Sequence, residues 1–307
     1  MADPAQPRPG HFLGDLGFEN EVITESHGIS RTRVTPHITG ADGGVRAGVL
    51  ATLVDVVGGM VGIRALSPHW MVTADLSVEM VRPAIGPYVE ARASVLRKGR
   101  TTMVIEAPVF NVLQDGTDVP DEAGRVTPAA WSTLTFAVLR GADLSHTMVM
   151  PSELPWRSTI AGNDLDRSLV DALSVSVLHA GEGRVSLPVA PYLHNSIGAV
   201  QGGAMALLGE VAGVEALGAA AGTAGASVVI TDLQVAYLTP GRVGPITTRA
   251  RVLDGFDGTT GGSAVIELVD EGADGRLTTV INVRGEVVDT KATGGGAADD
   301  EPIPVAS

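Results

Sequence analysis

The stretch that decides the fold is "HNSIGAVQGGAMALLGEVAG", residues 194–213. It begins with polar residues and glycines and continues as a run of small apolar residues, which predicts a buried helix. A carboxylate, Glu210, lies in the middle of that run. An acid in such a helix costs free energy unless a partner or a reaction uses it, so the segment is a candidate functional site.

The same pattern occurs a second time, 155 residues earlier in the chain. "PHITGADGGVRAGVLATLVDVVG" (36–58) aligns without a gap with "PYLHNSIGAVQGGAMALLGEVAG" (191–213), and eight of the 23 positions are identical. Asp55 aligns with Glu210, so the acid occurs in both copies. Internal self-similarity of this kind predicts two copies of one structural unit.

The segments that follow each helix predict strands. "TADLSVEMVRP" (73–83) matches "ITDLQVAYLTP" (230–240), and both alternate between apolar and polar residues. Each unit is therefore expected to be one helix followed by an antiparallel meander, an α+β fold. Further strands are expected at 89–99, 101–113 and 129–139 in the first unit, and at 246–255, 263–271 and 278–288 in the second.

The chain divides into two domains by this reading. We expect the first domain over residues 11–146, a connector over 147–164 and the second domain over 165–289. The tails, 1–10 and 290–307, are rich in proline, glycine and polar residues and are expected to be disordered.

Composition excludes several classes of function. The 307 residues carry a net charge of -14, which disfavours nucleic acid and anionic membranes as partners. The chain has no cysteine, and its seven histidines show no metal-ligand spacing, so we expect no metal and no cofactor. The opening residues do not resemble a signal peptide, and no run of 18 or more apolar residues predicts a membrane span, so we expect a cytoplasmic protein.

Both units resemble hotdog-fold thioesterases of the phenylacetate-pathway type. The signature of that family is a loop Asn, a His-Gly-Gly at a helix start and an acid inside the helix. Here the His position holds Arg46 in the first unit and Gln201 in the second. Residues 12–38 are also similar to the amino-terminal helix and first strand of the family. The resemblance implies two fused hotdog domains and an acyl-CoA thioesterase.

The resemblance further implies that each site combines parts of both units. The loop Asn and the helix-starting Gly come from one unit, and the acid and a Ser or Thr come from the other. The first possible site has all four parts: Asn195, Gly202, Asp55 and Thr73. The second lacks the amide and the hydroxyl, because its parts are Gly40, Ala47, Glu210 and Val228. We therefore expect one working site per chain, with Glu210 as the second choice for the acid if one unit supplies all the parts.

The chemistry of thioester hydrolysis assigns a role to each part. The N–H of Gly202 would polarise the thioester carbonyl, with Gln201 and Gly203 beside the substrate. Asp55 would attack the carbonyl carbon or activate a water, and these alternatives stay open. Asn195 would orient the water or the thioester, and Thr73 would hold the carboxylate or the water. The phosphates of coenzyme A would bind the cations of "LRKGR": Arg97, Lys98 and Arg100.

Simpler interpretations exist for the same residues. The two acids could reach solvent, Asn195 could be a turn residue, Thr73 an ordinary strand residue, and the three cations a solvated turn. A non-catalytic acyl-CoA-binding protein is the alternative function, and a hydratase is less favoured because the Asp/His pair of that group is absent. Since hotdog pairs usually assemble further, we expect a homo-oligomer.

Overall fold

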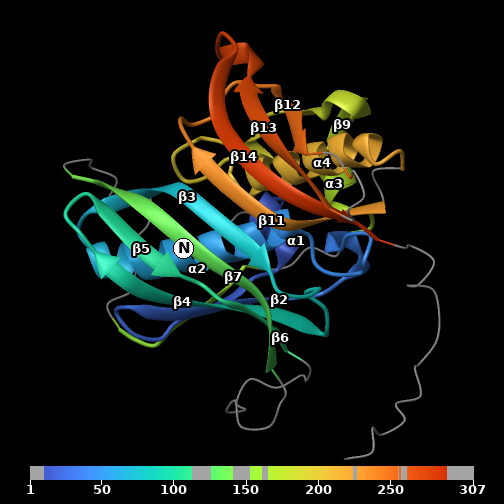
Figure 1. The fold of residues 1–307 in the computed structure, drawn as a ribbon. Coiled ribbons are helices and arrows are strands. Elements are labelled where there is room, and N and C mark those ends of the chain that lie inside the picture. The colour runs from blue at the N-terminus through green and yellow to red at the C-terminus, as the bar shows by residue number, and fades with distance from the viewer. Residues whose placement is uncertain are drawn as a thin grey trace, which may run out of the picture.

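A computed structural model describes residues 10–112, 126–140, 153–160, 165–223, 227–254, 256 and 261–288. The two halves lie side by side, each with a long helix against the concave face of strongly curved strands (Figure 1). Side chains fill the space between each helix and its strands, and this is where the core lies.

The first half begins with the short helix α1 (Phe12–Leu16) and strands β1 (Glu19–Val22) and β2 (His27–Arg33). The long helix α2 (Ala47–Leu66) follows, and 14 of its 20 residues are buried. After it come β3 (Trp70–Met80), β4 (Tyr88–Lys98), β5 (Thr102–Glu106), β6 (Val109–Val112) and β7 (Val126–Leu139). The expected helix followed by antiparallel strands is confirmed, but the expected meander is wrong in its order, because β3 pairs with β7 and not with β4.

The second half repeats this order. It runs through α3 (Leu169–Ala172), β9 (Ser176–His179), β10 (Arg184–Leu187) and the long helix α4 (Gly202–Ala220). The strands after α4 are β11 (Val228–Tyr237), β12 (Ile246–Asp254), β13 (Gly261–Asp270) and β14 (Arg276–Val287). β12, β13 and β14 pair in sequence, and β11 pairs with β14. The strand expected at 101–113 is divided into β5 and β6, and Ala107 and Pro108 separate them.

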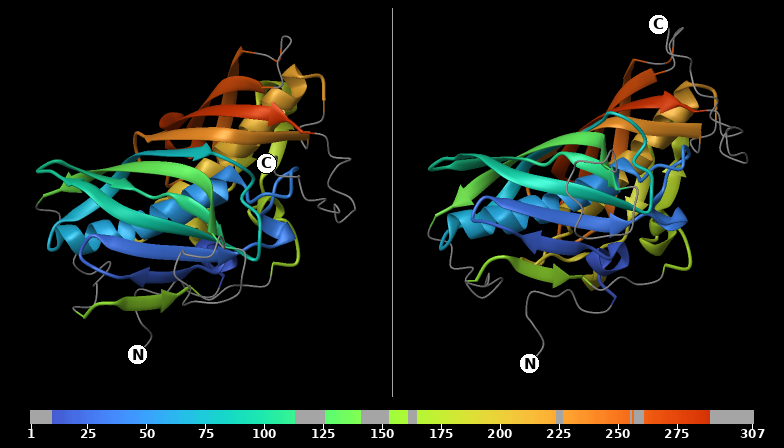
Figure 2. Two further views of the ribbon diagram at one scale, coloured as in Figure 1. Left: turned by 60° about the horizontal axis from the view of Figure 1, so that its bottom comes forward. Right: turned by 90° about the horizontal axis from the view of Figure 1, so that it is seen from below.

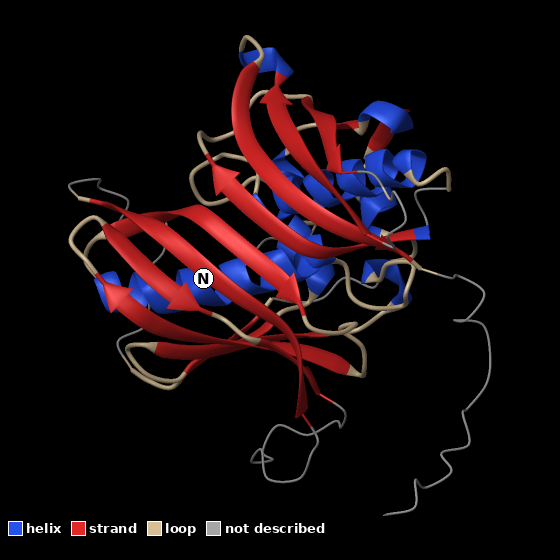
Figure 3. Cartoon of the chain, in the orientation of Figure 1, coloured by secondary structure: helices blue, strands red, loops and turns tan. Residues whose placement is uncertain are grey.

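A continuous antiparallel sheet joins the halves (Figures 2 and 3). Its central pair is β3 and β11, with Asp232 opposite Glu79 and Ala236 opposite Asp75. Beyond this register β11 ends at Tyr237, while β3 extends to Trp70. The amino-terminal half of β3 therefore has no partner strand on the side of β11 within the described sheet, and a cleft opens there between the halves.

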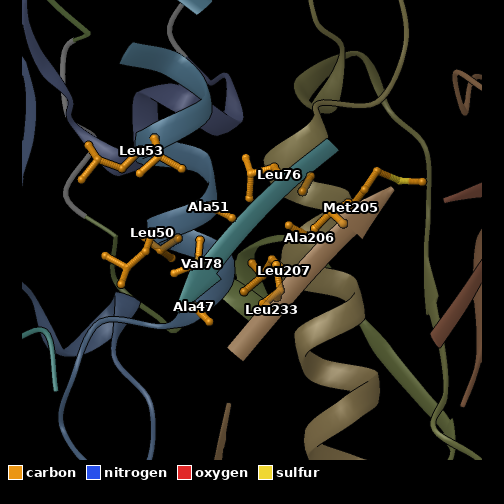
Figure 4. Packing of buried hydrophobic residues seen from close by; sticks show 14 of the residues in the cluster. Ala47, Leu50, Ala51, Leu53, Leu76, Val78, Met205, Ala206, Leu207 and Leu233 are labelled. Carbon is orange, nitrogen blue, oxygen red and sulfur yellow. The ribbon is translucent and has the colours of Figure 1, made fainter. Parts of the chain in front are cut away.

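The two long helices cross near their amino-terminal ends, where side chains of both halves interlock (Figure 4). A Cβ on Gly48 would lie 2.5 Å from Cα of Leu207, and a Cβ on Gly203 would collide with Thr52. These two contacts exchange under the 155-residue offset, since Gly48 aligns with Gly203 and Thr52 aligns with Leu207. A pseudo-twofold axis thus passes through the crossing, and small residues allow the close approach.

The long helices are apolar on all sides, as buried helices are. By length and hydropathy both pass as candidate membrane spans, which corrects the expectation that no segment is apolar enough. However, 67% of the apolar window of α2 and 83% of that of α4 are buried inside the fold. Both are the core helices of their halves.

The connector between the halves contributes a strand that the sequence reading did not include. Strand β8 (Trp156–Thr159) lies within residues 147–164 and pairs with β1 of the first half. The connector residues 147–152 and 161–164 and most of both tails lie outside the described residues.

Candidate active site

A tight turn leads into each long helix and has the same backbone in both halves. In the second half the N–H of Asn195 donates to the carbonyl of Ala199 at 2.7 Å, and the N–H of Gly198 donates to the carbonyl of Asn195 at 3.0 Å. Gly198 has φ of 70°, and its counterpart Gly43 has φ of 76°. Glycine is needed at both positions because other residues rarely adopt this left-handed conformation. The turn fixes where α4 begins relative to the rest of the site.

Asp55 and Thr73 of the first half lie together, as the sequence predicts. The hydroxyl of Thr73 on β3 donates a 2.7 Å hydrogen bond to Oδ1 of Asp55 on α2. Burial raises the pKa of Asp55 to about 6, and the hydrogen bond from Thr73 lowers it in part. The pKa of Asp55 is therefore much closer to neutral pH than that of an exposed aspartate.

The start of α4 from the second half meets this carboxylate. A Cβ added to Gly202 would lie 3.4 Å from Oδ2 of Asp55, so the acid is next to the first residue of the helix. Gln201 precedes the helix without a side-chain cap. Within the described residues, no hydrogen bond uses the N–H groups of Gly202 or Gly203. The N–H of Gly202 thus remains open at the helix terminus beside Asp55, and the N–H of Gly203 is the next donor of this first turn.

A cavity of about 290 Å³ contains these groups. Asp55, Thr73, Asn195, Gln201 and Gly202 all line it, so the structure brings together the four parts of the predicted cross-half site. The remaining lining includes a largely apolar wall made of Gly59, Ile63, Trp70, Met71, Val72, Phe136 and Met205. Gly203 is not part of the lining; it packs against Thr52 one residue into the helix.

Tyr237 is a further member of the site that the sequence reading missed. Its hydroxyl donates a 2.9 Å hydrogen bond to the carbonyl of Gly202. A Cβ on Gly202 would lie 3.0 Å from that hydroxyl, so only glycine fits between Tyr237 and Asp55 without displacing one of them. Burial, together with the charge of Asp55, raises the pKa of Tyr237 well above its ordinary value, which keeps the hydroxyl protonated.

The side-chain oxygen of Asn195 holds the turn together, and in the part of the chain that the structure describes its side-chain nitrogen is free to bind a ligand. Its Oδ1 accepts hydrogen bonds from the N–H groups of Ile197 at 3.1 Å and Ala199 at 3.0 Å, so it is a turn residue. Its Nδ2 has no partner within the described residues, and the residue lines the cavity. The two interpretations from the sequence are therefore compatible.

Glu210 lies elsewhere, at the start of the other helix. Its Oε2 accepts a 2.8 Å hydrogen bond from the N–H of Gly48, and its Oε1 is 3.5 Å from Nη1 of Arg46. The alternative that Glu210 joins Asn195 and Gly202 is thereby corrected. The physical reason is the helix crossing, which places each acid against the start of the opposite helix.

The second pseudo-equivalent position is closed by this contact. Glu210 is 3% exposed, and burial raises its pKa, while Arg46 and the N–H groups of Gly48 and Ala47 act in the opposite direction. Here a carboxylate of the protein itself binds the helix-terminal N–H groups. Glutamate is one methylene longer than aspartate and reaches these donors, whereas Asp55 leaves the matching donors of α4 open.

The basic residues of the β4–β5 turn lie outside the lining of the cavity. Lys98 Nζ donates to the carbonyl of Ala65 at 2.5 Å, close to the end of α2. Arg140 joins the group, because its Nε donates to the carbonyl of Arg100 at 2.9 Å. Ile63, which lines the cavity, precedes Ala65 by two residues on α2. These cations therefore lie near the part of the cavity that is formed by the carboxyl-terminal end of α2. In the described part of the chain, no group of three His, Cys, Asp or Glu residues could hold a metal ion.

Comparison with known proteins agrees with this geometry. The family model for the thioesterase superfamily matches residues 43–114 and 197–256, one segment in each half. Each half of the chain is thus similar to the thioesterase superfamily. Both matched segments begin in the turn before a long helix, where the site lies. A search of the curated proteins finds no match.

Solved structures of other proteins have the same double-hotdog fold over nearly their whole length. The TesB protein of Mycobacterium avium subsp. paratuberculosis is 12% identical, with a TM-score of 0.56, and the match covers 91% of this chain and 98% of that one. A protein described as a thioesterase II from Thermobifida fusca is 16% identical, with a TM-score of 0.56 and coverage of 90% and 98%. At these identities the likeness establishes the fold and no finer property.

Proposed function

We propose that this protein is an acyl-CoA thioesterase with one working site per chain, at the interface of its two halves. The observation that carries the proposal is the position of Asp55 beside the open amino terminus of α4. A carboxylate with a pKa of about 6 and unpaired N–H donors are the two elements that acyl transfer to water requires.

The N–H of Gly202 is the proposed donor to the thioester oxygen. Negative charge develops on that oxygen as the carbonyl carbon becomes tetrahedral, and helix-terminal N–H groups stabilise it. The closed site in the first half supports this role, because there the equivalent donors bind the carboxylate of Glu210. The same backbone geometry thus donates to a carboxyl oxygen within this chain.

Asp55 is the proposed acid that acts on the carbonyl carbon, through Oδ2. Thr73 holds Oδ1, and Oδ2 is the oxygen next to Gly202. As general base, Asp55 takes a proton from the attacking water, and the C–S bond then breaks as that proton passes to the leaving thiolate. As nucleophile, it forms an anhydride with loss of the thiolate, and water cleaves the anhydride. Both routes release coenzyme A and a carboxylic acid.

The other polar groups of the cavity position the reactants. The open Nδ2 of Asn195 would donate to the water or the thioester, and the side chain of Gln201 would contact the substrate beside the helix start. Coenzyme A carries phosphates, and we propose that Arg97, Lys98 and Arg100, with Arg140 next to them, bind these groups at the α2 end of the cleft.

Release of free thiol from acyl-CoAs tests the proposal. Short, aromatic and long acyl-CoAs are incubated with the wild-type protein, and hydrolysis of at least one of them is expected. Binding of an acyl-CoA without any turnover would favour the alternative, a non-catalytic acyl-CoA-binding protein. Label in the Asp55 carboxyl after a single turnover in ¹⁸O-labelled water would demonstrate the anhydride route with attack at the Asp55 carbon, since the general-base route labels only the product.

We also propose a cytoplasmic location and assembly of several chains. A net charge of -14 disfavours anionic surfaces, and the most apolar helices are buried. One chain already contains the hotdog pair, so a homo-oligomer would contain two or three such chains. Light scattering measures this directly, and a monomer would contradict the assembly without affecting the proposed site.

A further inference from the structure

Helix α2 contains three glycines in the segment "GGMVG", residues 58–62, and only two of them have close neighbours at the Cβ position. A Cβ on Gly58 would lie 3.3 Å from Leu134 and Phe136, and a Cβ on Gly62 would collide with Met71. A Cβ on Gly59 would meet nothing within 4 Å. Glycine weakens a helix relative to alanine, so packing does not account for Gly59.

The open space beside Gly59 belongs to the proposed active site. Gly59 lines the cavity one helical turn after Asp55, and Ile63 lines it one turn further. With a rise of about 1.5 Å per residue, these positions lie about 6 Å and about 12 Å along α2 from the acid. The helix thus presents one straight wall that begins at the reacting carboxylate.

Several apolar side chains that line the cavity with this wall are buried, whereas other lining residues are exposed. Trp70 is 9%, Met71 5% and Phe136 2% exposed, while Leu238 is 54% exposed. An apolar acyl group gains free energy by packing against the buried apolar side chains. The nucleotide of coenzyme A is polar and too large for the remaining volume, so it extends outward.

The second half provides an internal comparison. Under the 155-residue offset, Gly59 aligns with Val214 of α4, whereas Gly58 aligns with another glycine, Gly213. Gly213 is again closely packed, since its Cβ would lie 2.8 Å from Cγ2 of Val283. This helix position therefore accepts a branched side chain in the half whose own site is closed.

We propose that Gly59 is the specificity-determining residue that sets the size of the acyl group. The proposal rests on the proposed function, because it requires the thioester carbon to lie at Asp55. A side chain at position 59 would occupy the space of the acyl carbons roughly one helical turn from the thioester. Short acyl groups end before that point and are unaffected.

The test is the acyl-length profile of kcat/KM in Gly59→Ala, Gly59→Val and Gly59→Leu. For straight-chain acyl-CoAs from two to twelve carbons, we expect the longest accepted groups to lose about 10- to 200-fold in Gly59→Leu. Acetyl-CoA should change by less than about 2-fold. Gly59→Ala should raise the melting temperature while it shortens the profile, which separates blocked space from structural damage. Val214→Leu is the matched control in α4 and should keep the wild-type profile.

Two results overturn the proposal. One is an unchanged profile in a folded Gly59→Leu protein, and the other is an equal loss for all chain lengths, acetyl-CoA included. The proposed function fails separately, if the wild type hydrolyses none of the acyl-CoAs. In that case the affinities of the same acyl-CoAs for the wild type and Gly59→Leu give the length profile.

Discussion

The N–H of Gly48 donates a 2.8 Å hydrogen bond to Oε2 of Glu210, whereas the equivalent donor on the other helix, Gly203, has no partner within the described residues. Two changes separate the halves at this point. Glutamate replaces aspartate, and the residue before the helix is Arg46 in one half and Gln201 in the other. Burial raises the pKa of both acids; Arg46 lies beside Glu210 and lowers its pKa in part, whereas the neutral Gln201 stands at the equivalent position next to Asp55. Of the two pseudo-equivalent positions, one is therefore a structural contact between the halves, and the other is the candidate site.

Loss of the Glu210 carboxylate should weaken the fold. In Glu210→Ala the N–H of Gly48 loses its buried acceptor, and we expect the free energy of unfolding to fall by about 1–3 kcal/mol. Urea unfolding measures the change. Glu215→Ala removes a carboxylate from the same helix that has no such contact and should change stability by less than about 0.5 kcal/mol. Equal effects of both substitutions would contradict the structural role of Glu210.

The rate of hydrolysis should depend on the ionisation of Asp55. Both proposed routes need the carboxylate, and burial raises its pKa to about 6, so kcat/KM should fall below about pH 6 rather than near pH 4. The hydrogen bond from Thr73 lowers this pKa. Thr73→Val should therefore move the midpoint to higher pH, which a pH–rate profile measures. A midpoint that stays in place would show that Thr73 does not act through Asp55.

The hydroxyl of Tyr237 should support the start of α4. Tyr237→Phe removes the 2.9 Å hydrogen bond to the carbonyl of Gly202, a loss of about 1 kcal/mol. If that energy holds the helix terminus in its reactive position, kcat falls about 5- to 10-fold. Tyr192→Phe is the control, because Tyr192 bonds to Asp15 away from the cavity lining. Similar kcat values for both variants would rule out this role for Tyr237.

The basic cluster of the β4–β5 turn should affect only substrates that carry phosphates. Replacement of Arg97, Lys98 and Arg100 by serine should raise KM for acyl-CoAs about 10-fold, since exposed ion pairs each contribute little. Acyl thioesters of N-acetylcysteamine lack phosphates and should keep their KM. Serine at the exposed Arg249 and Arg251 of β12 is the control. A similar rise in KM for both kinds of thioester would contradict phosphate binding by this turn.

The sequence was sufficient to predict the two long helices, most of the long strands and the two-unit organisation. Runs of small apolar residues marked the helices, alternation marked the strands, and the 155-residue offset aligned Asp55 with Glu210. The cross-half meeting of Asp55 with Gly202 came from the family resemblance, because no local pattern shows which helix start an acid faces.

Contacts between distant residues could not be predicted in the same way. Tyr237 aligns with Met80 in the strand repeat, and this polar difference was the available signal for its role. The closure of the second position depends on one methylene of Glu210 and on Arg46, which only the helix crossing brings together. Strand β8 forms because β1 offers an edge, and its own sequence has no distinct strand signal.

The central claim is that Asp55, and not Glu210, is the acid of a single cross-half site. The most direct test compares thiol release by the wild type, Asp55→Asn, Asn195→Ala and Glu210→Gln, with the same acyl-CoA and with folding checked by circular dichroism. We predict that Asp55→Asn loses about 10²- to 10⁴-fold in kcat, that Asn195→Ala loses about 10²-fold, and that Glu210→Gln stays within about 5-fold of the wild type. Full activity in Asp55→Asn together with loss in Glu210→Gln would contradict the account.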